Sequence, residues 1–162
     1  MEKSVKKLNY FLEPGNVFVC WQPYKLATVV GSSVAICMFD QLSKVSGMTV
    51  FSFPNSTYKN EIPYSGAHSI PQLLEMMYNL GARNHNIQAH VLGGSFSKLY
   101  QNKDIGKKNI EMAFKSLKKN RIQIINDDTG GIFGRKIVFD TACGDIVVYK
   151  AKYIREKDWY DY

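Results

Sequence analysis

Glycine and small hydroxyl residues stand between two apolar segments in the first third of the chain, at Gly31, Ser32 and Ser33. A serine at such a turn combines a rigid backbone with an exposed side chain, an arrangement typical of nucleophiles. A Gly-Ser-Ser sequence between two strands also serves as an ordinary turn. The residue types alone leave both interpretations of Ser33 open.

The other residues that could do chemistry are three cysteines and three histidines. None of them has the spacing of a metal site, so we expect no bound metal and no cofactor. Cys37 lies inside an apolar run, which predicts a buried thiol. His68, His85 and His90 are expected to be surface or structural histidines.

Two glycine pairs, Gly93-Gly94 and Gly130-Gly131, each follow a segment with strand character. Consecutive glycines let a backbone approach a ligand closely and can bind anions through their amides. Neither pair is followed by the Gly-Lys-Ser or Gly-Lys-Thr sequence of a phosphate-binding loop. We therefore interpret them as close-approach positions rather than as a nucleotide site.

The elements that must position these residues are strands and two helices. Apolar, β-branched runs predict about eight strands, at residues 17–21, 26–30, 34–39, 48–53, 87–92, 121–126, 136–140 and 145–150. The first helix is predicted from Ser69, which has capping-box spacing to Gln72, to Gly81, and the second over residues 106–120. This order predicts an α/β (α+β) layered sandwich with a mixed β-sheet.

Composition limits the class of protein. A chain of 162 residues with 45% hydrophobic residues and no internal linker is expected to form one domain over residues 1–162. The longest apolar run, residues 34–39, has six residues, so we expect no membrane insertion and a cytoplasmic protein. The formal net charge of +7 would suit either an acidic protein partner or a nucleic acid.

Taken in order, six segments resemble the CheD family, the chemoreceptor glutamine deamidases of bacterial and archaeal chemotaxis. Residues 28–40 are similar to the family's Thr-Leu-(Leu)-Gly-Ser-Cys-Val-Ala-Val strand, and residues 47–54 resemble its Gly-Met-Ala-His segment. The other four segments are residues 80–82, 93–94, 105–109 and 128–140. Six motifs in this order at compatible spacing make a specific signal that covers about residues 15–149.

The resemblance implies a chemistry and assigns positions to it. In the family a cysteine thiolate attacks the side-chain amide of a receptor glutamine, a histidine acts as base, and a threonine helps to orient the histidine. Thr28 falls on the family threonine, Ser33 on the cysteine, and Val50, seventeen residues later, on the histidine. Valine cannot accept a proton, so the family mechanism cannot operate here in its usual form.

Three hypotheses follow. The first is a CheD-like protein with weak or no deamidase activity that binds the family's partners, chemoreceptor cytoplasmic domains and a CheC-like phosphatase, around a pocket of Gly31, Ser32, Gly93 and Gly94. The second is an active deamidase in which Ser33 and Thr28 use a histidine from elsewhere. The third is a basic nucleic-acid-binding module, resting on the net charge of +7. We favour the first and expect no nucleic-acid partner, because no base-stacking aromatic motif is present.

Overall fold

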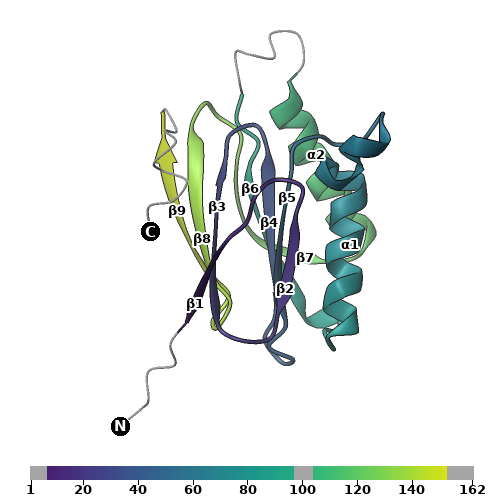
Figure 1. Cartoon of the computed structure of the whole chain (residues 1–162), viewed down its shortest axis with the longest axis vertical. Coiled ribbons are helices and arrows are strands. Elements are labelled where there is room, and N and C mark those ends of the chain that lie inside the picture. The colour runs from purple at the N-terminus through teal and green to yellow at the C-terminus, as the bar shows by residue number, and fades with distance from the viewer. Residues whose placement is uncertain (1–6, 97–103, 153–162) are drawn as a thin grey trace.

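Two β-sheets pack face to face, and the two long helices cover the outer face of the second sheet (Figure 1). The computed structural model describes residues 7–96 and 104–152. The result is a layered arrangement of sheet, sheet and helices, as the sequence predicts. No helix within these residues is both long and apolar enough to cross a membrane.

The first sheet has the strand order β1-β3-β8-β9. Its strands are β1 (Leu8–Phe11), β3 (Tyr24–Val30), β8 (Gly134–Asp140) and β9 (Asp145–Ala151). β1 pairs in parallel with β3, and the other two pairings are antiparallel. Buried and half-buried residues alternate along most of β8, as expected for a strand with one covered face, whereas residues 26–30 of β3 are all buried.

The second sheet has the strand order β2-β5-β4-β6-β7. Its strands are β2 (Val17–Cys20), β4 (Val34–Asp40), β5 (Ser46–Phe51), β6 (Ile87–Gly93) and β7 (Gln123–Thr129). β6 and β7 are parallel and the other pairs are antiparallel. Every residue of β4 and β5 is buried, because the first sheet covers one face and the helices cover the other.

The helices pack on this sheet through one apolar face each. They are α1 (Gly66–Asn79) and α2 (Ile105–Lys119), with short 3-10 turns at η1 (Lys59–Tyr64) and η2 (Asn84–Asn86). The buried hydrophobic residues of α1 recur at helical spacing and those of α2 lie four residues apart; they are Ile70, Leu73, Leu74, Met77, Ala113 and Leu117.

The structure corrects four details of the sequence prediction. α1 begins at Gly66 with Ser65 as its N-cap residue, so the prediction of a capping box at Ser69 was wrong. Ser69 is buried inside the helix. The strand predicted to begin at Arg121, β7, begins at Gln123. β1 was not predicted, and the nine described strands form two mixed sheets rather than one. The differences in the strands arise because strand pairing depends on contacts between residues far apart in sequence.

Candidate functional site

The segment Gly31–Ser33 connects the two sheets. β3 of the first sheet ends at Val30, and β4 of the second sheet begins at Val34. At its start β4 is flanked on both sides, since Val34 pairs with Phe51 of β5 and with Gly93 of β6. Ser33 therefore lies at the end of the central strand, where the ends of three strands meet.

The hydroxyl of Ser33 is paired with a second hydroxyl. Its Oγ lies 3.1 Å from Oγ of Ser52, and either atom can donate the hydrogen bond. Ser52 directly follows β5, and both serines are half-buried. Among the described residues, no charged side chain is hydrogen-bonded or ion-paired to either hydroxyl. The pair is thus a neutral polar group at the surface end of the sandwich.

Asn109 joins helix α2 to both serine-bearing segments. Its side-chain amide donates to the carbonyl oxygens of Ser32 and Ser52, each at 2.9 Å. The side chain is fully buried, and its Oδ1 has no hydrogen-bond partner among the described residues. A buried side-chain amide of this kind fixes the backbone segments to which it donates. If those segments moved away, their buried carbonyl groups would be left without donors, which costs free energy.

Gly93 and Gly94 support the same segment from the other side. Gly94 donates its backbone N–H to the carbonyl of Ser33, at 2.9 Å. Gly93 has φ of +107°, and a Cβ there would lie 2.4 Å from the Ser33 carbonyl oxygen. A side chain would therefore displace Ser33, which explains the glycine in physical terms. The structure brings these predicted pocket residues next to Ser33.

Val50 lies in the core between the two sheets. It is fully buried and faces Ala35 of β4 across the strand pair. Its neighbours belong to an apolar cluster, whose buried members are Leu12, Leu26, Val30, Ala35, Cys37, Phe39, Met48, Val50, Leu92, Ile137 and Phe139. A valine side chain has no atom that can accept a proton, so residue 50 supplies no base to Ser33.

Thr28 and Cys37 are also interior residues. The Thr28 hydroxyl donates to the carbonyl oxygen of Leu12 at 2.7 Å, so it is bonded to the segment that follows β1. Cys37 is completely buried, as predicted, and burial raises the pKa of its thiol well above the usual value. A buried thiol with a raised pKa is a packing residue rather than a nucleophile.

All three histidines lie within the described residues, and none is hydrogen-bonded to Ser33. His68 and His85 are exposed. His90 is buried, and its Nε2 lies 2.8 Å from the carbonyl oxygen of Gly144. Burial lowers the pKa of His90, although the Gly144 bond and nearby Asp145 oppose this effect.

Arg135 holds the glycine-rich loop that follows β7. Its guanidinium is buried and donates to Asp128 Oδ1 at 3.1 Å and 3.3 Å, to the Gly130 carbonyl at 2.9 Å and to the Phe133 carbonyl at 3.1 Å. Burial alone would raise the pKa of Asp128, but hydrogen bonds from Lys150 and Arg135 outweigh it and lower the pKa. The loop is therefore fixed by a hydrogen-bonded ion pair.

This loop lies beside the Ser33 segment and carries exposed apolar side chains. The Gly131 carbonyl accepts a hydrogen bond from Phe96 N–H at 2.8 Å, and the Gly31 carbonyl accepts one from Ser95 N–H at 2.9 Å. Ile132 and Phe133 of the loop are exposed, as is Phe96, which follows β6. Exposed apolar groups on ordered loops are typical of protein-binding surfaces.

Two residues of this site, Ser52 and Asn109, were not predicted as functional from the sequence. Asn109 stands in one of the segments that resemble the family, and this was the only available signal for it. Ser52 gives no signal, since its role depends on the pairing of β4 with β5. No group of three potential metal ligands occurs in residues 7–96 and 104–152.

Comparison with known proteins identifies the family. Residues 52–150 match the family model described as CheD chemotactic sensory transduction. The matched range begins at Ser52, so it lies after Ser33 and Val50 in the chain.

Individual relatives extend the match over most of the chain. A protein of Trichlorobacter lovleyi is 35% identical over 148 residues, which are 88% of this chain and 91% of the relative. Proteins of Methanococcus maripaludis and Clostridium botulinum are 34% and 37% identical, over 84% and 78% of this chain and 91% and 83% of their own. Each is named a probable chemoreceptor glutamine deamidase CheD. With these matches over the greater part of its length, the chain belongs to the CheD family.

Proposed function

We propose that this protein is a chemotaxis protein that binds the cytoplasmic domains of chemoreceptors and has weak or no glutamine deamidase activity. The observation that carries the proposal is the pairing of Ser33 with Ser52 at 3.1 Å, with Val50 buried in the core. We place the binding site at the surface end of the sandwich, where Gly31, Ser32 and Ser33 meet Gly93 and Gly94. A cytoplasmic location follows from the proposed partner.

The chemistry of amide hydrolysis supports the proposed weak or absent deamidase activity. A serine hydroxyl is a poor nucleophile near neutral pH unless a neighbouring base removes its proton. Ser52 is neutral and cannot do so, and none of the three histidines is hydrogen-bonded to Ser33. General base catalysis contributes about 100-fold to 10,000-fold in rate, so a site without a base is expected to be slow.

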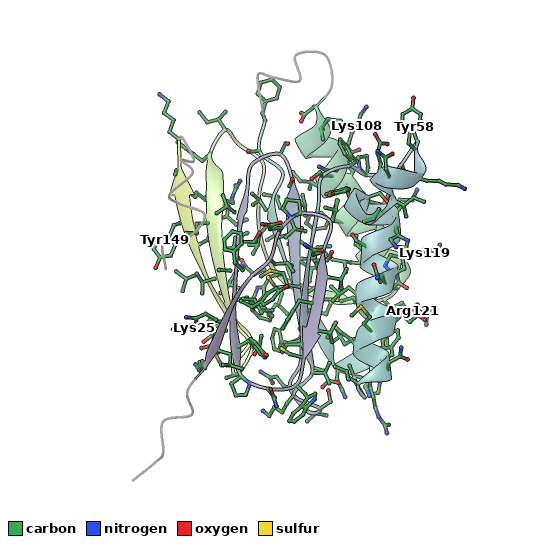
Figure 2. The ribbon with its side chains drawn as sticks, in the orientation of Figure 1. Lys25, Tyr58, Lys108, Lys119, Arg121 and Tyr149 are labelled. Atoms are coloured by element: carbon green, nitrogen blue, oxygen red, sulfur yellow. The ribbon has the colours of Figure 1, made fainter. Side chains whose placement is uncertain are left out.

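The surface around Ser33 supports a protein partner. Phe96, Ile132 and Phe133 offer exposed apolar contacts. Exposed Lys107 and Lys108 lie at the start of α2, next to Asn109, and Figure 2 shows Lys108 at the same end of the molecule as Tyr58. The helices of chemoreceptor cytoplasmic domains are generally acidic, so these charges are complementary to the proposed partner.

Further lysines extend along the second helix. Lys118 and Lys119 occupy its last turn, and Figure 2 shows Lys119 and Arg121 on the helical side of the molecule.

We propose that a CheC-like phosphatase, the second partner implied by the family resemblance, also binds this protein. We also propose that Thr28 corresponds to the threonine that helps to orient the histidine in the family.

Two measurements on the purified protein test the proposal. Ammonia release and mass spectrometry of a receptor cytoplasmic fragment are expected to show deamidation far slower than a cysteine-containing CheD protein produces. Isothermal titration calorimetry is expected to show binding of the same fragment. Deamidation at the rate of the cysteine-containing protein, or a complete lack of binding, would reject the proposal.

A further inference from the structure

The polar groups next to the Ser33–Ser52 pair are already committed to the protein's own structure. The carbonyl oxygens of Ser32 and Ser52 accept hydrogen bonds from Asn109. The carbonyl of Ser33 accepts from Gly94, at 2.9 Å. Among the described residues, the two hydroxyls are bonded only to each other. The hydroxyl that donates within the pair can still accept from a ligand, and the other can still donate to one.

The two hydroxyls are held in place from several sides. Asn109 ties both serine-bearing segments to α2, and the backbone N–H of Gly94 holds the Ser33 carbonyl from the side of β6. Their separation of 3.1 Å is therefore set by the surrounding backbone rather than by the serine side chains alone. Such a preorganised pair loses little conformational freedom when a ligand binds.

A primary carboxamide matches this pair. It presents a carbonyl oxygen that accepts and an amino group that donates, on neighbouring atoms. One serine hydroxyl can donate to the oxygen while the other accepts from the amino group. The pairing needs no proton transfer, so the amide remains intact.

A carboxylate of the same shape is a poorer ligand here. Each hydroxyl has one proton, so both can donate to a carboxylate only if the hydrogen bond between Ser33 and Ser52 is broken, whereas the amide leaves that bond in place. Charge separates the two ligands as well, because Ser33 and Ser52 are half-buried and no described cation is bonded to them. Removing a carboxylate from water without a paired cation costs much more free energy than removing a neutral amide.

We infer that Ser33 and Ser52 bind the intact side-chain amide of a receptor glutamine and disfavour the glutamate that deamidation produces. This inference rests on the proposed function, since it takes the chemoreceptor as the partner. It makes the protein a reader of the modification state of the receptor. A protein of this kind would associate with receptors that still carry glutamine and leave those that have been deamidated.

The test uses a purified receptor cytoplasmic fragment in two forms, with glutamine or with glutamate at its modification sites. Calorimetry with the full chain is expected to give at least a fivefold lower Kd for the glutamine form. The double variant Ser33→Ala with Ser52→Ala is expected to bind both forms with a Kd ratio close to one. Ser116→Ala, on α2 away from the pair, is the matched control and is expected to keep the preference.

The outcomes separate the inference from the proposed function. Equal binding of both forms by the unmodified chain, or tighter binding of the glutamate form, would overturn the inference and leave receptor binding intact. Binding of neither form would overturn the proposed function itself. Mass spectrometry of the glutamine form after the titration is expected to show unchanged glutamine, and conversion to glutamate would also overturn the inference.

Discussion

The side-chain oxygens of Ser33 and Ser52 lie 3.1 Å apart, so the hydroxyl at the position predicted for the nucleophile is bonded to another neutral hydroxyl. The residue at the position predicted for the base, Val50, is buried between the sheets. Both parts of an acid–base pair must therefore be replaced before the family chemistry can proceed.

Restoring both residues is expected to restore deamidation. The double variant Ser33→Cys with Val50→His should release ammonia from a receptor fragment at least about 100-fold faster than either single variant, because the thiolate depends on a base. Circular dichroism establishes that all three variants are folded. A folded double variant that is no faster than Ser33→Cys alone would show that position 50 does not supply the base.

Gly93 is expected to be intolerant of any side chain. Gly93→Ala would place a Cβ 2.4 Å from the Ser33 carbonyl oxygen. Gly81 is a matched control, since its φ of +104° is close to the +107° of Gly93 and a Cβ there would meet nothing within 4 Å. We expect Gly81→Ala to lower the free energy of unfolding by about 1 to 2 kcal/mol, the cost of the left-handed backbone conformation.

The steric clash should add to that cost at Gly93. We expect Gly93→Ala to lower the free energy of unfolding by about 1 to 3 kcal/mol more than Gly81→Ala, as overpacking usually does. Urea denaturation followed by circular dichroism measures both. Equal costs for the two variants would contradict the close contact between Gly93 and Ser33.

Asn109 is expected to stabilise the site. Asn109→Leu keeps the approximate volume but removes the donors to the Ser32 and Ser52 carbonyl oxygens. We expect a loss of about 2 to 4 kcal/mol in the free energy of unfolding, since two acceptors lose their partners. Asn79→Leu, at the exposed end of α1, is the control and should change stability by less than about 0.5 kcal/mol.

His90 is expected to make stability depend on pH. Burial holds the pKa of His90 below its ordinary value of 6.5. Between these two pKa values the histidine is protonated in the unfolded chain but neutral in the folded protein. The free energy of unfolding should therefore fall as the pH decreases below about 6.5, by up to about 1.4 kcal/mol per pH unit. The proton would have to enter at Nδ1, which is buried and has no partner among the described residues.

Two glutamine variants assign this effect. Urea denaturation between pH 7.5 and pH 5.5 should show a smaller decrease in stability for His90→Gln than for the unmodified chain. His85 is exposed, so His85→Gln should leave the decrease unchanged. An identical pH dependence in His90→Gln and the unmodified chain would contradict the assignment.

Local patterns predicted much of the fold. The apolar run at residues 34–39 forms the buried strand β4, and the apolar spacing in the two helical segments produces α1 and α2. The start of α1 was predicted wrongly because Ser69 satisfies a local capping pattern, whereas Ser65 is the N-cap residue. The division into two sheets could not be predicted, since pairing such as that of β3 with β8 joins residues about a hundred positions apart.

The candidate site shows the same division. The order of short motifs was enough to identify the family, and the sequence alone determined that serine and valine occupy positions 33 and 50. Only the tertiary structure decided what surrounds Ser33, because Ser52 is 19 residues away in sequence and Asn109 is 77 residues from Ser32. Hydrogen bonds over such separations depend on strand register and helix packing, which no local pattern of residues determines.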